Sequence, residues 1–231
     1  KIARGTANIA VGPAMSREQA IQCLETGIQV CQEHIASGTE LFACGDMGIG
    51  NTTPSSAITS VVTGAGTDVT TGRGTGLDDA GLAHKAEVVQ RSIDVNKPNS
   101  KDGLDILMKV GGFEIGVLAG VFLGAAAGRR PVIVDGFISG AGALVAHAIA
   151  PEASYSFIAS HQSVEPGHRL GLSHMGLEPL LDIGMRLGEG SGAVLSMHIV
   201  EAAAKCLSDM TTFAEAGVSE KIEDDSQGET S

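Results

Sequence analysis

Positive charge is scarce in this sequence. Lys and Arg number 15 against 27 Asp and Glu, which gives a formal net charge of −12. A protein that neutralises the phosphates of DNA or RNA needs a clustered basic surface, so we expect no nucleic-acid partner. Any anionic ligand must instead be held locally, by backbone N–H groups and a few lysines or arginines.

Paired cysteines and long apolar runs are missing as well. The four cysteines are scattered and form no CxxC pair, which argues against a zinc knot or redox motif and favours reduced thiols in a cytoplasmic protein. The most apolar region, Ile115 to Ala127, is shorter than the ~20 residues of a membrane span and predicts a buried helix. We expect no signal peptide and no membrane partner.

Aromatic residues make up only 3% of the chain, whereas glycine occurs 32 times. This combination is typical of α/β proteins with tight turns and glycine-rich ligand loops. The length allows one sizeable core. We therefore predict one domain over residues 1–219 and a disordered acidic tail over 220–231.

Short apolar strands alternate with helices along the sequence. A helix is predicted at 16–38, where Ser16 and Gln19 can form a capping box and Gly38 can end it. Strands are predicted at 41–44, 131–134 and 155–159. Further helices are predicted from about 54 and at 78–92, 103–110, 114–128, 139–150, 169–175, 178–186 and 191–209.

This alternation predicts parallel β-α units in an α/β fold, a three-layer α/β/α arrangement with a parallel sheet. Because three strands are few for such a sheet, we expect part of it to lie upstream of Lys1. Polar or glycine-rich loops follow the predicted strands, at 45–53, 135–139 and 160–168. Since ligands bind beyond the carboxyl ends of parallel strands, the three loops predict one shared site.

The first of these loops, CGDMGIGNTT at 44–53, is close to a Walker A motif. Asn51 and Thr52 follow Gly50, where a P-loop has Lys and Ser or Thr. The missing lysine disfavours an NTPase, whereas N–H groups at a helix N-terminus can still hold a monophosphate. The alternative is a tight strand-to-helix turn. Because Asp46 would repel a phosphate, we expect it to face a hydroxyl or an N–H group.

Other candidates are weaker when each is considered alone. TGRGTG at 71–76 departs from a dinucleotide fingerprint, and Lys85 beyond it is either a cation for an anion site or a solvated side chain. The segment HQSVEPGH at 161–168 matches no common metal-ligand spacing, so a polar ligand loop is favoured. Glu189 lies between two glycines before a helix. It is either a general base or an acidic residue that only interacts favourably with the helix dipole.

Four motifs, GDMGIGNTTPSSAI, DGFISGAGA, SHQSVEPGH and RLGEGSGA, occur in this order. Together they resemble the nicotinate-nucleotide:dimethylbenzimidazole phosphoribosyltransferase family, from KIARGTANIA to about Glu220. The resemblance implies a three-layer α/β domain, a small helical domain built from both termini, and a homodimer. It also implies transfer of phosphoribose from nicotinate mononucleotide to 5,6-dimethylbenzimidazole in cobalamin biosynthesis. The products are α-ribazole 5′-phosphate and nicotinate, with inversion at the anomeric carbon and without a metal or other cofactor.

The resemblance also implies roles for individual residues. Glu189 is implied as the catalytic base that takes the N–H proton of the benzimidazole, while the opposite nitrogen attacks C1′ as nicotinate leaves. Asp46 is a second catalytic candidate, and Leu187 is implied as a substrate-binding residue. The residues implied to hold the nucleotide phosphate are Gly48, Gly74, Lys85, Gly136 and Ser163.

Two departures from the family pattern affect this interpretation. Asp46 stands where the family usually has glutamate, so its carboxylate is drawn back by roughly one bond's reach, ~1.5 Å. The family also has a further N-terminal segment, with residues that line the benzimidazole pocket, before the position of Lys1. The alternative function is therefore a truncated or degenerate homologue that binds a mononucleotide without catalysis.

Overall fold

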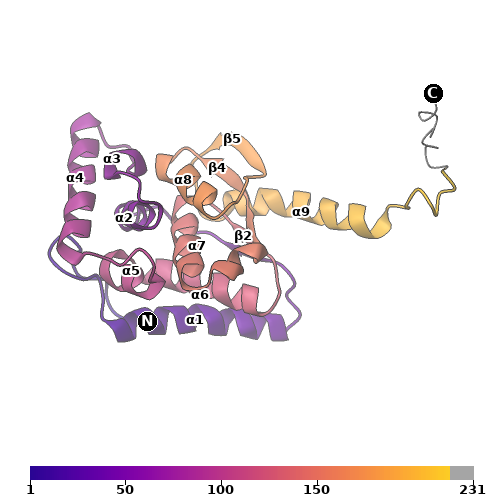
Figure 1. Cartoon of the computed structure of the whole chain (residues 1–231), viewed down its shortest axis with the longest axis horizontal. Coiled ribbons are helices and arrows are strands. Elements are labelled where there is room, and N and C mark those ends of the chain that lie inside the picture. Colours follow the sequence, from indigo (N-terminus) through magenta and orange to yellow (C-terminus); the bar gives the residue numbers. More distant parts are fainter. Residues whose placement is uncertain (219–231) are drawn as a thin grey trace, which may run out of the picture. The chain divides into compact units, whose positions relative to one another are not determined.

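The computed structural model describes residues 1–218, and the tail predicted at 220–231 lies outside them. The chain separates into two compact units, Lys1–Met197 and a second that begins at His198. The first unit contains both sheets and most of the helices (Figure 1). The helix α9 (Ser191–Asp209) begins in the first unit and continues into the second.

The main sheet consists of three parallel strands, β1 (Phe42–Cys44), β2 (Val132–Val134) and β3 (Phe157–Ala159), in the order β1-β2-β3. Ala43 pairs with Ile133, which pairs in turn with Ile158. All three residues of β2 are buried, as expected for a central parallel strand. The three predicted strands and the predicted α/β class with a parallel sheet are confirmed.

Eight α-helices precede α9 in the first unit. They are α1 (Arg17–Ala36), α2 (Thr52–Thr63), α3 (Thr67–Thr70), α4 (Asp79–Asn96), α5 (Gly103–Val110), α6 (Phe113–Ala127), α7 (Phe137–Ile149) and α8 (Pro166–His174), with a 3-10 turn, η1, at Pro151–Ser156. Ser16 and Gln19 form the predicted capping box of α1. The helix α6 packs between α1 and α7 and also contacts β1 and β2.

The prediction of a helix at 178–186 is wrong, because Leu181–Met185 is a strand, β5. It pairs in parallel with β4 (His161–Ser163), a strand that we had predicted as loop. Gly184 has a φ of +70°, a left-handed conformation that breaks a helix and that glycine adopts without strain. The N–H of Leu181 donates to the carbonyl of Ser160, so β5 begins beside the residue that joins β3 to β4.

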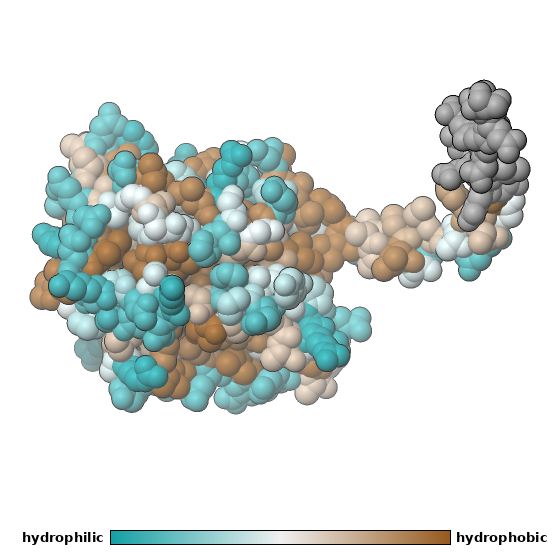
Figure 2. Space-filling model, in the orientation of Figure 1, coloured by the Kyte–Doolittle hydropathy of each residue, from teal (hydrophilic) through white to brown (hydrophobic). Residues whose placement is uncertain are grey.

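The apolar helix α6 is buried in the fold, as predicted. Ile115, Ala119 and Phe122 on this helix have no exposed surface. None of the helices described for residues 1–218 is both long and apolar enough to cross a membrane. On the face of the molecule that Figure 2 shows, hydrophilic and hydrophobic residues of the first unit are interspersed.

The helices that follow β1 and β2 start in a way that matters for the site. The residue before α2 is Asn51 and the residue before α7 is Gly136, and neither provides a side-chain cap. By contrast, Asp78 and Asp102 cap α4 and α5 through their carboxylates. The first N–H groups of α2 and α7 are therefore left for another partner.

Candidate active site

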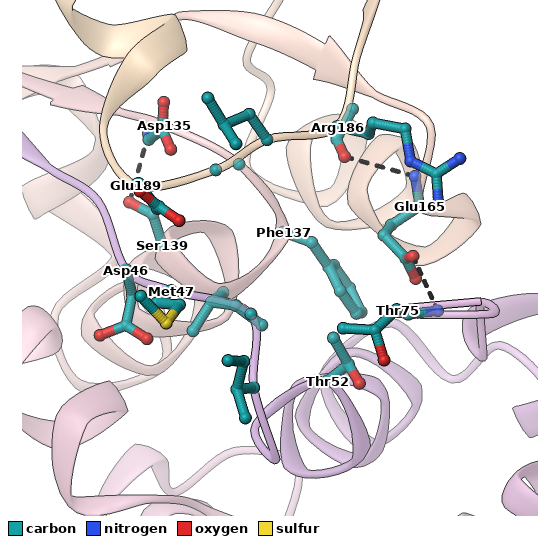
Figure 3. Close-up of a pocket in the computed structure, with 18 of the residues that line it drawn as sticks. Asp46, Met47, Thr52, Thr75, Asp135, Phe137, Ser139, Glu165, Arg186 and Glu189 are labelled. Carbon is teal, nitrogen blue, oxygen red and sulfur yellow. Dashed lines mark hydrogen bonds between the residues drawn. The ribbon is translucent and has the colours of Figure 1, made fainter. Parts of the chain in front are cut away.

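A cavity of about 530 Å³ lies where the loops at the carboxyl ends of the strands meet. Its lining comes from loops 46–52, 135–139 and 161–165, together with 74–75 and 186–189 (Figure 3). The three loops that we predicted to form a shared site therefore do so. In Figure 3, Asp46 and Glu189 lie on one side of Phe137, whereas Thr52, Thr75 and Arg186 lie on the other.

Hydrogen-bond donors also line the cavity. The starts of α2 and α7 both line the cavity, so the positive ends of two helix dipoles are directed toward it. Within residues 1–218, the N–H groups of Gly48 and Gly136 donate to no protein acceptor. Uncapped N–H groups at helix starts are a common arrangement for binding phosphate.

Lys85 lies just behind this part of the lining. Its Nζ donates to Thr52 Oγ1 and to the carbonyl of Gly72, each at 2.9 Å. A Cβ on Gly74 would lie 3.4 Å from this Nζ. Burial lowers the pKa of Lys85, and the nearby carboxylate of Glu165 opposes that shift. The alternative interpretation of Lys85 as a solvated side chain is wrong, because the side chain is buried.

Ser163 and Glu165 complete this side of the cavity. The Oε1 atom of Glu165 accepts from the N–H of Gly74 at 3.1 Å, and its Oε2 atom is buried without a partner in the described residues. The N–H of Ser163 donates to His168 Nδ1 at 3.0 Å. Burial, and secondarily His161, lowers the pKa of His168 to about 3, so this ring stays a neutral acceptor. The hydroxyl of Ser163 accepts from the N–H of Glu165, which leaves its hydrogen for a ligand.

Glu189 has an unusual backbone conformation on the opposite side. Its φ is +57°, between Gly188 at +72° and Gly190 at +81°. A left-handed conformation at a non-glycine residue costs on the order of 1–3 kcal/mol and is typical of functional sites. The N–H of Glu189 donates to the carbonyl of Asp46 at 3.0 Å, which joins the backbones of the two predicted catalytic residues.

Asp46 faces an N–H group, as predicted. Its Oδ1 accepts from Nδ2 of Asn51 at 2.7 Å, and the same amide also donates to the carbonyl of Met47. Burial raises the pKa of Asp46, and the Asn51 hydrogen bond opposes that shift. The residue that replaces the P-loop lysine thus orients a carboxylate.

Of the predicted site residues, Lys85 alone is outside the lining itself. The lining contains the others, namely Glu189, Asp46, Gly48, Gly74, Gly136, Ser163 and Leu187. Sequence reasoning missed Asp135, Glu165 and Arg186 as individual site residues. Glu165 and Asp135 lie in loops that were predicted to bind a ligand. Arg186 was assigned to a helix, so its place in the lining could not be predicted.

No three His, Cys, Asp or Glu side chains in the described part of the chain are grouped so that they could hold a metal ion. His161 and His168 lie close together, with ring centroids 5.9 Å apart, but both are buried and both have a lowered pKa through burial. The polar groups of the cavity are therefore hydrogen-bond donors and carboxylates.

Residues 1–218 match a family model described as Phosphoribosyltransferase. The chain belongs to this family. It is 57% identical over 224 residues to the nicotinate-nucleotide–dimethylbenzimidazole phosphoribosyltransferase of Desulforudis audaxviator (strain MP104C), which covers 97% of this chain and 64% of the relative. It is 56% identical over 223 residues to the protein of the same name from Roseiflexus castenholzii (strain DSM 13941 / HLO8), with 96% and 63% covered. The resemblance carried by the four motifs is thereby confirmed.

A solved structure agrees with these relatives. The crystal structure of nicotinate-nucleotide-dimethylbenzimidazole phosphoribosyltransferase from Thermus thermophilus is similar with a TM-score of 0.88 at 42% identity. The alignment covers 96% of this chain and 65% of that one. The present chain therefore spans somewhat less than two thirds of the length of the curated relatives that it matches.

Proposed function

We propose that the protein catalyses, in this cavity, the transfer of phosphoribose from nicotinate mononucleotide to 5,6-dimethylbenzimidazole. The products are α-ribazole 5′-phosphate and nicotinate, and the reaction belongs to cobalamin biosynthesis. One observation carries the proposal: a single cavity has anion-binding donors on one side of Phe137 and Glu189 on the other (Figure 3). The names of the related proteins specify the same pair of substrates for those proteins.

In this proposal the nucleotide phosphate binds at the donor side. The free N–H groups of Gly48 and Gly136 and the hydroxyl of Ser163 donate to phosphate oxygens, and Lys85 provides a positive charge from behind the lining. The N–H of Gly74 also faces this region, but Glu165 accepts from it at 3.1 Å. A phosphate that uses Gly74 must therefore displace the Glu165 carboxylate.

Chemistry takes place near Glu189. Its carboxylate accepts the N–H proton of the benzimidazole, and the opposite ring nitrogen forms a bond to C1′ of the ribose. The bond from C1′ to the pyridinium nitrogen breaks, and its electron pair stays on that nitrogen as nicotinate leaves. The incoming azole and the leaving nicotinate lie on opposite faces of C1′, so the anomeric carbon inverts.

Leu187 and Asp46 flank the proposed base. Leu187 lines the cavity and is 66% exposed, which offers an apolar surface for an aromatic substrate ring. Asp46 is half-buried and shares its backbone contact with Glu189, so its carboxylate can accept a hydrogen bond from the ribose or the azole. No metal or other cofactor is required for this transfer.

We also propose that the protein is a cytoplasmic homodimer without a nucleic-acid or membrane partner. The net charge of −12 disfavours a nucleic-acid partner, and the homodimer and its location rest on the resemblance to the family. Light scattering coupled to size exclusion tests the assembly. A mass twice that of the 23.4 kDa chain is expected, and a monomer at every concentration contradicts the dimer.

The product assay tests the function directly. The full chain is incubated with nicotinate mononucleotide and 5,6-dimethylbenzimidazole, and α-ribazole phosphate is sought by mass spectrometry. Product is expected only when both substrates are present. Binding of the nucleotide in calorimetry without any product would contradict the transferase and favour the alternative, a module that binds a mononucleotide without catalysis.

A further inference from the structure

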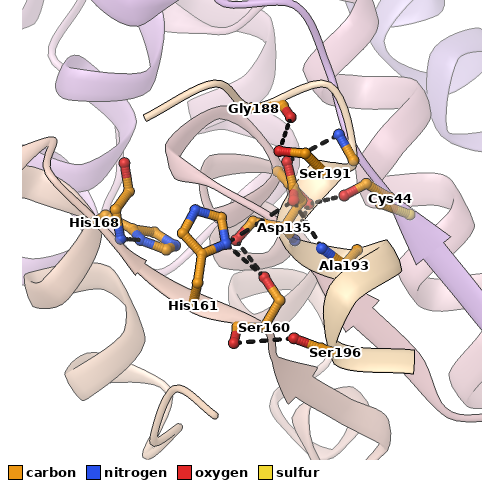
Figure 4. Close-up of polar contacts among 12 residues, drawn as sticks. Cys44, Asp135, Ser160, His161, His168, Gly188, Ser191, Ala193 and Ser196 are labelled. Atoms are coloured by element: carbon orange, nitrogen blue, oxygen red, sulfur yellow. Dashed lines mark hydrogen bonds and ion pairs between the residues drawn. The ribbon is translucent and has the colours of Figure 1, made fainter. Parts of the chain in front are cut away.

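We infer that Asp135 positions the catalytic loop by holding the backbone that directly follows Glu189 to the end of β2. This role rests on the proposed function, because its effect on turnover acts through Glu189. Asp135 lies one residue beyond β2 and only 1% of it is exposed. It lines the cavity but its carboxylate is directed at the start of α9 (Figures 3 and 4).

The turn at 188–190 requires external support. All three residues have positive φ, and Glu189 is the one that carries a Cβ. Such a conformation persists only where the surrounding structure fixes it. Space is also closed behind the turn, because a Cβ on Gly45 would lie 2.1 Å from the nitrogen of Gly190.

Both carboxylate oxygens of Asp135 provide that support. Oδ2 accepts from the N–H of Gly190, and Oδ1 accepts from the N–H of Ala193, each at 3.0 Å. These are N–H groups at the start of α9 that have no acceptor within their own helix. Asp135 therefore caps α9 from a distant part of the sequence, 55 and 58 residues away.

Hydrogen bonds also fix the backbone of Asp135. Its N–H contacts the carbonyl of Cys44 at 3.3 Å and Oγ of Ser139 at 3.2 Å. Its carbonyl accepts from the hydroxyl of Ser160 at 3.0 Å. The ends of β1, β2 and β3 thus fix the backbone of Asp135, and its side chain transmits that position to the Glu189 turn.

Nδ1 of the neighbouring His161 lies 4.0 Å from Oδ1 of Asp135, too far for a hydrogen bond, so the N–H groups of α9 remain the hydrogen-bond donors to this carboxylate. Because the Ser160 hydroxyl donates its hydrogen to Asp135, we assign the 2.8 Å contact between Ser160 Oγ and His161 Nδ1 to a donating Nδ1–H (Figure 4). Burial lowers the pKa of His161, although Asp135 opposes the shift, so the ring is neutral. The carboxylate is therefore compensated by α9, which cannot move without unpairing it.

The loss of a carboxylate charge at a helix start could by itself produce an effect, so the test needs a control. Asp102 caps α5 through Oδ1 alone, which accepts from the N–H groups of Leu104 and Asp105, both at 3.1 Å. It does not line the cavity. Because asparagine keeps one acceptor oxygen, Asp135→Asn leaves one of the two N–H groups of α9 without an acceptor, whereas Asp102→Asn removes the same charge and keeps its cap.

Positioning predicts a specific kinetic pattern. A displaced catalytic group costs up to about 100-fold in rate, so we expect kcat of Asp135→Asn to fall by about 30- to 100-fold. The dissociation constant for nicotinate mononucleotide should stay within about twofold, because the donor side is unaffected. Asp102→Asn should keep kcat within about twofold of the wild type. Asp135→Asn with wild-type kcat would overturn the inference.

A second readout does not depend on turnover. Amide hydrogen exchange at Gly190 and Ala193 should accelerate by about tenfold or more in Asp135→Asn and stay unchanged in Asp102→Asn. Unchanged exchange in Asp135→Asn would overturn the inference. If that variant does not fold, Asp135→Glu replaces it in both measurements, since it keeps two acceptor oxygens but displaces them. A wild type without turnover contradicts the proposed function alone, and hydrogen exchange then decides whether Asp135 holds the loop.

Discussion

The two sides of the cavity carry different chemical groups. On one side, backbone N–H groups at the starts of α2 and α7 are supplemented by a buried lysine. On the other, the carboxylate of Glu189 is carried by a turn with three successive positive φ values. The first side offers uncapped N–H groups that suit an anion, whereas the second has a strained backbone at a candidate base. The comparison separates binding from chemistry, and each side can be changed on its own.

The helix starts at the cavity show the same division. Side chains cap α4 and α5 through Asp78 and Asp102, and Asp135 caps α9 from outside its own segment. The helices α2 and α7 have no such cap and begin at the cavity. Free N–H groups are costly to bury without a partner, so a ligand oxygen is the natural acceptor at these two positions.

The largest expected effect comes from Glu189→Gln. Glutamine keeps the size of the side chain but cannot take a proton from the azole, so kcat should fall by about 10²- to 10⁴-fold. The KM for nicotinate mononucleotide should stay within about twofold, because the phosphate side is intact. Steady-state kinetics of product formation provides the measurement. An unchanged kcat would show that another group acts as base.

Lys85→Met should have a large effect on the KM for nicotinate mononucleotide rather than on kcat. It keeps the apolar stem but removes the charge and the hydrogen bonds to Thr52 and Gly72. We expect KM for nicotinate mononucleotide to rise at least about tenfold, with a smaller change in kcat. Lys101→Met, at an exposed lysine, is the matched control and should behave as the wild type. Equal KM values for the two variants would contradict the assignment of Lys85 to the phosphate side.

Asp46→Glu tests the departure from the family pattern. Glutamate reaches one bond farther toward the substrate, but it loses the placement that lets Asp46 accept from Asn51 at 2.7 Å. We expect a modest change, an increase in kcat of about threefold, with KM for the nucleotide unchanged. Kinetics with 5,6-dimethylbenzimidazole as the varied substrate measures it. A fall of tenfold or more would show that aspartate is required at this position.

Asp46→Asn should have the smallest effect, which is on stability. Burial raises the pKa of Asp46, so the folded state takes up a proton before the unfolded state as pH falls, and the wild type gains stability there. Asparagine keeps an acceptor for Asn51 and has no charge to bury. We expect Tm of Asp46→Asn to exceed that of the wild type by about 1–3 °C near neutral pH.

This advantage should shrink below the raised pKa of Asp46 and disappear toward 3.8, its ordinary value, because the wild-type carboxyl is then also neutral. Differential scanning calorimetry at about pH 7 and about pH 4.5 measures the two differences. A Tm difference that grows as the pH falls would contradict the direction of the shift.

Local patterns made much of this structure predictable. The capping box at Ser16, the β-branched run at 132–134 and the loops beyond each strand are encoded by neighbouring residues. The strand pair β4 and β5 could not be predicted in the same way. Leu181–Met185 is too short to show a period, and its partner His161–Ser163 is made of polar residues, so pairing rather than propensity decides the structure.

The same distinction between local patterns and long-range contacts applies to the site residues. Glu189 and the glycines of the loops are visible in the sequence because flanking residues mark them. Asp135 has no local signal, since its partners Gly190 and Ala193 lie 55 and 58 residues away. The tautomer assigned to His161 likewise depends on Ser160 and Asp135 meeting in space. These long-range hydrogen bonds could not be predicted from the sequence alone.

Calorimetric titration with nicotinate mononucleotide tests the division of the cavity most directly. The chain has no tryptophan, so heat is a better signal than intrinsic fluorescence. The wild type, Glu189→Gln and Lys85→Met are titrated in one buffer. We predict that Glu189→Gln binds within about twofold of the wild type and that Lys85→Met binds at least about tenfold more weakly. Equal weakening in both variants, or in neither, would contradict the separation of binding from chemistry.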